Sequence, residues 1–102
     1  MDVRHDDPEL EKIEADPDYH GKFGEAVITG FRKAMNLVRM ATNEVQLHNW
    51  KGLRLEKLSG KRSHQHSMRI NKQWRLIVEF ISRPGPNNNL CAVKEISDHY
   101  ET

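Results

Sequence analysis

The chain has 102 residues, of which 36% are hydrophobic and 30% are charged, and its formal net charge is +1. This length suits one domain with a thin core, and no apolar run approaches the roughly 20 residues that a membrane-spanning helix needs. The first ten residues contain no apolar segment typical of a signal peptide, and the one cysteine, Cys91, has no partner in the chain. We therefore expect a cytoplasmic protein without intramolecular disulfides.

The small net charge conceals an uneven distribution. Residues 1–25 contain nine acidic and three basic residues, which leaves residues 26–102 with six acidic and thirteen basic ones, a formal charge of +7. A basic body of this kind favours a polyanion or an acidic protein as partner.

The first elements are a short strand and a helix. Residues 1–4 are expected to form an edge strand. Asp7 and Pro8 then mark a helix start, because an aspartate can cap the helix and a proline fits its first position. Leu10 and Ile13, three residues apart, form the predicted buried side of this helix.

A longer helix follows a loop over residues 16–24. Residues 25–40 repeat apolar side chains at intervals of three and four, which predicts an amphipathic helix. Its apolar positions are Val27, Ile28, Phe31, Ala34, Met35 and Val38. Residues 41–52 read as a connection, with one helical turn that directs Val45 and Leu47 inward.

The second half of the chain reads as strands. They are predicted over residues 53–58, 64–70, 73–81 and 90–97. Turns at 59–63 and Asn71–Lys72 separate the first three strands, and residues 82–89 are predicted to form a loop. We expect residues 84–89 of this loop to be mobile, because they include two prolines and no apolar anchor. The third strand places Trp74, Leu76, Val78 and Phe80 on one face. The predicted class is α+β, with N-terminal helices packed on one face of a small twisted antiparallel sheet.

The strand region contains a concentrated basic segment. Between Gly60 and Val78 the chain has no carboxylate and five cations, namely Lys61, Arg62, Arg69, Lys72 and Arg75, together with His64 and His66. Single basic residues commonly do no more than solvate a surface, but five without an adjacent acid repel each other and have no ion-pair partners within the segment. We predict that they form a phosphate-binding face on the side of the sheet away from the helices.

A specific motif lies in the same segment. The chain contains Leu58-x-Gly60-x-Arg62, then Ser67-x-Arg69-Ile70-Asn71-x-Gln73-Trp74-Arg75, and later Asp98. Over about residues 23–100 this pattern resembles the HigB-like branch of the RelE/ParE toxin superfamily, whose members are toxins of bacterial type II toxin–antitoxin pairs. The resemblance implies one RelE-like domain over residues 1–102.

The chain departs from the family pattern at two places. The usual Asp-Tyr-His ending is here Asp98-His99-Tyr100, and a lysine that many members have before the turn glycine is Ser59. The role of that lysine would have to pass to Lys57 or Lys61, or be absent.

The resemblance implies a ribosome-dependent mRNA endoribonuclease, or mRNA interferase, that needs no metal or other cofactor. In such cleavage a 2′-OH attacks the adjacent phosphate, so a base, an acid and a cation are needed. The sequence contains no CxxC or HExxH spacing and no phosphate-binding glycine loop.

The residues that match this chemistry fall into two groups. The candidate catalytic residues are Arg62, Asp98, His99 and Tyr100. The candidate RNA-binding residues are Lys57, Lys61, His64, His66, Arg69 and Arg75. Arginines give forked hydrogen bonds to phosphate, histidines transfer protons, and aromatic rings stack on bases. Alternative structural roles stay open: Arg69 and Arg75 could pair with Glu79, and Trp74 and one of His64 and His66 could be packed.

The resemblance also implies partners. These are a cognate helix-turn-helix antitoxin of the HigA-like kind, mRNA on the ribosome, and promoter DNA only through the antitoxin; no membrane is involved. Two other functions stay open, a ParE-like toxin that inhibits DNA gyrase without cleaving nucleic acid, and an inactive RNA-binding relative.

Overall fold

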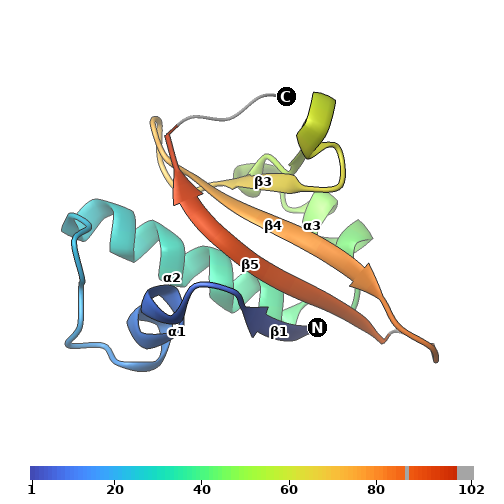
Figure 1. Cartoon of the computed structure of the whole chain (residues 1–102), viewed down its shortest axis with the longest axis horizontal. Helices are drawn as coiled ribbons and strands as arrows, with labels where there is room; N and C mark the ends of the chain where they lie inside the picture. The colour runs from blue at the N-terminus through green and yellow to red at the C-terminus, as the bar shows by residue number, and fades with distance from the viewer. Residues whose placement is uncertain (87, 99–102) are drawn as a thin grey trace.

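The computed structural model describes residues 1–86 and 88–98. One sheet has the strand order β1-β5-β4-β3-β2. Its strands are β1 (Asp2–His5), β2 (Glu56–Lys57), β3 (His66–Arg69), β4 (Arg75–Ser82) and β5 (Asn89–Ser97). The α-helices are α1 (Pro8–Ala15), α2 (Glu25–Met40) and α3 (Glu44–Asn49), and two 3-10 turns are η1 (Lys51–Leu53) and η2 (Gly60–Arg62). The α-helices pack on one face of the sheet (Figure 1), which confirms the predicted α+β architecture.

The two N-terminal helices form as their sequences predict. The Asp7 side chain caps α1 by accepting a hydrogen bond of 2.9 Å from the backbone N–H of Glu9, and Leu10 and Ile13 are buried. All six predicted apolar residues of α2 are buried. They pack against side chains of the central strands, including Leu76 and Val78, to form the core.

The first strand pairs differently from the others. β1 lies at an edge, as predicted, but it pairs in parallel with β5, with Val3 opposite Cys91. The pairs β2–β3, β3–β4 and β4–β5 are antiparallel. A parallel partner requires a long crossover, and most of the chain separates β1 from β5.

Gly30, in the middle of α2, is explained by close packing. A Cβ atom at this position would lie 2.5 Å from the carbonyl oxygen of Ile70 and 2.6 Å from its Cγ2. Only a residue without a side chain lets α2 approach the β3–β4 turn so closely.

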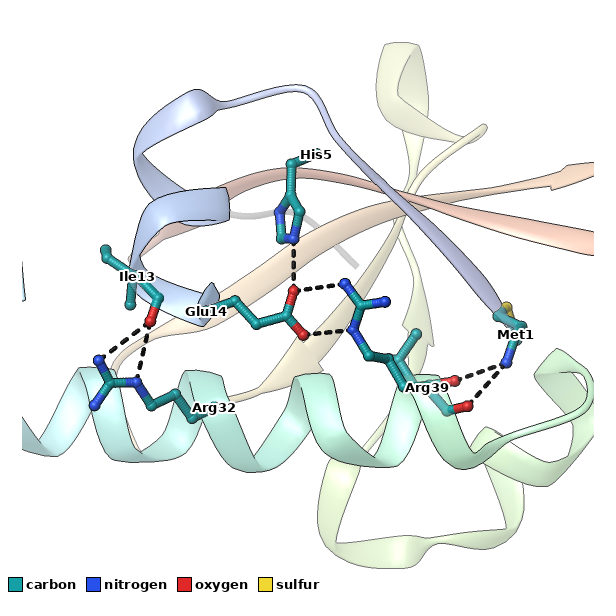
Figure 2. A network of polar contacts seen from close by, with 7 residues as sticks. Met1, His5, Ile13, Glu14, Arg32 and Arg39 are labelled. Carbon is teal, nitrogen blue, oxygen red and sulfur yellow. Dashed lines mark hydrogen bonds and ion pairs between the residues drawn. The ribbon is translucent and has the colours of Figure 1, made fainter. Parts of the chain in front are cut away.

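A polar network ties β1 and α1 to α2 (Figure 2). Nε2 of His5 lies 2.7 Å from Glu14, and the Arg39 guanidinium donates two hydrogen bonds to the same carboxylate, at 2.7 and 2.8 Å. Arg32 donates to the carbonyl oxygen of Ile13 at 3.1 and 3.2 Å. The amino group of Met1 donates to carbonyls at the C-terminal end of α2. These contacts fix the helices relative to the edge strand.

The sheet has two distinct faces. We call the face that packs on the α-helices the helix face and the other the open face. Residues paired across strands point to the same face, so the pairs Met68–Leu76 and Leu76–Ile96 lie on the helix face and the pairs Ser67–Ile77 and Ile77–Glu95 on the open face.

A β-bulge in β5 decides which side chains reach the open face. Ile77 pairs with Glu95 but Val78 pairs with Val93, so Lys94 is the extra residue. Without the bulge Glu95 would share a face with Val93. With it, Glu95 lies on the open face and Ile96 returns to the core.

Several predicted element boundaries and orientations were wrong. The segment 53–58 is mostly a 3-10 turn followed by a two-residue strand, and the strand expected from residue 64 starts at His66. Val45 is exposed rather than inward, whereas Leu47 is buried as expected. Trp74 is only half-buried and contacts the ring of Phe23 edge-on.

The loop before β5 has polar rather than apolar anchors. Arg83 donates hydrogen bonds to the backbone and side chain of Asn88 and to Asp2, and Asn88 donates to the carbonyl of Pro84. Mobility of residues 84–89 stays a prediction. Of the helices described, none is long and apolar enough to cross a membrane.

Candidate functional site on the open sheet face

Arg62 is positioned by the η2 turn. Gly60 begins this turn with φ of +64°, a conformation that favours glycine. Nε of Arg62 donates a hydrogen bond of 2.9 Å to the side-chain oxygen of Gln65, which orients the guanidinium. Its far nitrogen lies 3.6 Å from the carboxylate of Glu95, and one third of the side chain (33%) is exposed. The guanidinium therefore spans from η2 to β5 and still faces solvent.

His64 follows the same turn and reaches the neighbouring strand. Its Nε2 lies 3.7 Å from the Glu79 carboxylate on β4, and 59% of the side chain is exposed. The contacts of Arg62 and His64 with Glu95 and Glu79 show that the segment carrying η2 lies against the open face. Full burial of Ile77 agrees with this. Figure 1 shows η2 on the side of the sheet away from α1 and α2.

The sequence indicates that the basic segment is isolated from carboxylates. In the folded protein it is not. Folding brings glutamates beside three of its residues: Glu95 lies near Arg62, Glu79 near His64, and Glu56 is 4.0 Å from Arg75. These glutamates lie outside the segment of residues 60–78 in the sequence, Glu79 directly after it. The open face is therefore a mixed surface of cations and carboxylates.

Arg75 differs from the other predicted phosphate ligands because it is buried. Only 5% of the residue is exposed. Its Nε donates to Ser67 Oγ and its far nitrogen to the Ser67 carbonyl, both at 3.1 Å, and that nitrogen also donates to the carbonyl of Arg54. This guanidinium links β4, β3 and the segment before β2, which is a structural role.

Arg69, Arg75 and Ser97 form a row across three strands. Arg69 pairs with Arg75, and Arg75 pairs with Ser97 at the end of β5. Asp98 follows Ser97 directly, so the chain leaves the sheet at this row. The predicted residues His99 and Tyr100 lie outside the described residues.

A groove adjoins this row. It has a volume of about 560 Å³ and lies between α2, η1 and the β3–β4 turn. Lys33, Lys51 and Arg69 contribute to its lining beside Trp50. Three cations near an aromatic ring continue the basic character of this end of the sheet.

His66 and Lys57 lie apart from Arg62 and His64. They pair with each other, and His66 also pairs with Val78 on the helix face. Burial lowers the pKa of His66, against the opposite effect of the nearby Glu44 carboxylate. Lys61 is exposed in η2. Strand alternation starting at residue 64 would put both histidines on one face, but the turn separates them.

Sequence reasoning missed the carboxylates Glu79 and Glu95 as members of the site. Alternation along β4 could have placed Glu79 on the face opposite Leu76 and Val78. Glu95 was hidden by the bulge, which no pattern in residues 90–97 marks.

The comparison with protein families identifies the family of the chain. Residues 3–93 match the family described as RelE-like toxin of type II toxin-antitoxin system HigB. No curated protein matches the chain. Because the family match extends over most of the 102 residues, the chain belongs to the HigB-like family of type II toxin–antitoxin toxins.

Proposed function

We propose that this protein is a ribosome-dependent mRNA endoribonuclease that inhibits translation, and that its cleavage site is the open face around Arg62. The observation that carries the proposal is that the partly exposed Arg62 and the exposed His64 both reach the open face, which no α-helix covers, in a chain of this toxin family. Metal-free RNA cleavage needs a cation for the phosphate and groups that transfer protons.

Arg62 is proposed to hold the scissile phosphate. Its hydrogen bond to Gln65 uses one of five N–H donors, and its contact with Glu95, at 3.6 Å, is longer than a hydrogen bond. The guanidinium thus has donors left for forked bonds to phosphate oxygens. These bonds strengthen as negative charge accumulates on the pentavalent phosphate in the transition state.

His64 and the C-terminal residues are proposed to transfer protons. The exposed imidazole of His64 stands 3.7 Å from Glu79, whose carboxylate can orient it or accept its proton. Asp98, His99 and Tyr100 stay proposed catalytic residues. These residues directly follow Ser97 in the sequence. Ser97 ends β5, where it pairs with Arg75 of β4, and it lies two residues after Glu95, the neighbour of Arg62. Lys61 and Arg69 are proposed to bind RNA around this centre, whereas Lys57 and His66, which pair with each other on the helix-face side, are the weakest of the RNA-binding candidates.

Membership in this family implies a cognate antitoxin. We propose a helix-turn-helix antitoxin of the HigA-like kind, which binds promoter DNA on behalf of the pair. The basic character of residues 26–102 favours attraction of an acidic antitoxin segment.

The test uses induced expression followed by mapping of new 5′ ends in a translated transcript. The proposal predicts new ends in translated regions within minutes, none when translation initiation is blocked, and none when the antitoxin is co-expressed. A ParE-like toxin would instead leave transcripts intact while gyrase supercoiling of plasmid DNA is lost. That outcome, or growth arrest with neither effect, would overturn the proposal.

A further inference from the structure

A second cluster of polar side chains lies on the opposite side of the sheet from Arg62. Glu44 and His48 are four residues apart on α3, so they project from the same side of that helix. His66 approaches them from β3, with its Nε2 3.9 Å from the Glu44 carboxylate. One ligand-type atom from each residue lies within 4.8 Å of the other two.

The ring of His66 is held by packing. It lies edge-on against Phe80, with ring centroids 5.1 Å apart, and against His48 at 6.5 Å. Its Nδ1 is buried and has no hydrogen-bond partner among the described residues.

We propose that Glu44, His48 and His66 bind one zinc ion that links α3 to β3. Two imidazoles and one carboxylate are a ligand set that zinc accepts, with water at the remaining position. Bonds of about 2.0–2.1 Å in a tetrahedral site place ligand atoms roughly 3.3 Å apart. The present separations must therefore shorten by at most about 1.5 Å, which side-chain rotations of the exposed His48 and the partly exposed Glu44 can provide.

A simpler role for Glu44 exists and must be separated from metal binding. Glu44 is the first residue of α3, after the Asn43 cap, where a carboxylate interacts favourably with the helix dipole. That role needs neither His48 nor His66. Convergence of two imidazoles from two different elements on the carboxylate is what points to a metal.

The zinc site is independent of the proposed cleavage site. His66 pairs with Val78 on the helix face, whereas Arg62 and His64 contact glutamates of the open face. The ion would therefore stabilise the position of the short helix α3 and take no part in RNA cleavage. Cleavage should persist after zinc is removed with a chelator, so failure of either proposal leaves the other testable.

The test titrates chelator-treated protein, free of any affinity tag, with zinc chloride in a calorimeter and in thermal melts. Wild type should bind one equivalent, and its melting temperature should rise with zinc and then level off. Glu44→Gln and His48→Ala should each weaken binding at least about tenfold and melt like zinc-free wild type. His20→Ala and Glu11→Gln are matched controls at exposed positions outside the cluster, and they should bind like wild type.

Cobalt(II) gives a second readout that does not depend on stability. Added to wild type it should develop visible absorption bands of a site with nitrogen and oxygen ligands, and zinc should abolish them. His48→Ala, at an exposed position that leaves the core intact, should not show these bands. Absence of saturable one-to-one binding, or equal binding by wild type, Glu44→Gln and His48→Ala, would overturn the proposal and mark the zinc as adventitious.

Discussion

Arginine–glutamate contacts occur in two regions of this protein with opposite character. Beside α2, Arg39 makes two short hydrogen bonds, of 2.7 and 2.8 Å, to Glu14, and His5 adds a third contact to the same carboxylate (Figure 2). The Glu14 side chain is only 14% exposed and that of His5 only 4%. On the open face, Arg62 and His64 stand 3.6 and 3.7 Å from their glutamates, outside hydrogen-bond distance.

The difference separates contacts that hold the fold from groups available to a ligand. In the His5–Glu14–Arg39 network the carboxylate uses its acceptor sites inside the protein, so the network stabilises the packing of β1 and α1 on α2. On the open face the Arg62–Glu95 and His64–Glu79 contacts are long and their side chains are partly exposed, and such contacts contribute little to stability. Arg62 thus has donors left for phosphate, and its loss should affect chemistry more than folding.

The largest stability effect is expected at Arg75, which lies on the open face by register but is buried. Arg75→Met removes hydrogen bonds to Ser67 and to the carbonyl of Arg54. We expect a loss of about 2–4 kcal/mol of unfolding free energy, because buried acceptors lose their donor. Urea unfolding measures this. A loss within experimental error would mean that Arg75 is not structural and would return it to the candidate phosphate ligands.

A smaller effect, with a pH signature, is expected from Glu14→Gln. Hydrogen bonds from Arg39 hold the pKa of Glu14 below its ordinary value. The stabilisation is therefore present above the unfolded-state pKa of about 4.3 and is lost as the pH falls through the lower folded-state pKa. At pH 7 we expect Glu14→Gln to lower the unfolding free energy by about 1–2 kcal/mol.

Urea unfolding of wild type and Glu14→Gln over a series of pH values checks this sign. The stability difference should be constant above the unfolded-state pKa and shrink steadily in acid. A difference that grows in acid would contradict the assignment of the network as a fold-stabilising carboxylate site.

The matched substitution on the open face, Glu95→Gln, should have the smallest effect on stability. The Glu95 side chain is half exposed and its contact with Arg62 is 3.6 Å. We expect a change within about 0.5 kcal/mol, as for other exposed pairs. The urea midpoint measures it, and a loss as large as that of Glu14→Gln would remove the distinction between the two regions.

The sequence predicted the elements whose stability is local. The period of apolar residues in α2 and the Asp7–Pro8 start of α1 are readable because capping and amphipathicity depend on neighbours in the chain. The helix-covered sheet follows from the same pattern. The glycine at position 30 could not be explained from its neighbours, because its cause, the carbonyl of Ile70, lies far away in the sequence.

The candidate site was only partly predictable, because non-local pairing assembles it. Arg62 lies within the predicted turn 59–63, as part of η2, but its glutamate neighbour depends on a bulge at Lys94. Burial of Arg75 depends on the carbonyl of Arg54, which approaches from another segment. The separation of His64 from His66 depends on where the turn ends and β3 begins. None of these has a signal within its own stretch of sequence.

The central claim, that the two regions divide stability from chemistry, is tested by Arg62→Ala and Arg39→Ala in parallel. Transcript cleavage on translating ribosomes and urea unfolding would be measured for both and for wild type. Arg62→Ala should lose about 2–4 kcal/mol of transition-state stabilisation, which lowers the cleavage rate roughly 30- to 1,000-fold. Its unfolding free energy should be nearly unchanged. Arg62→Lys should restore only part of the rate. Arg39→Ala should cleave like wild type but lose about 1–2 kcal/mol of stability. Full cleavage by Arg62→Ala, or cleavage lost only because that variant unfolds, would contradict the account.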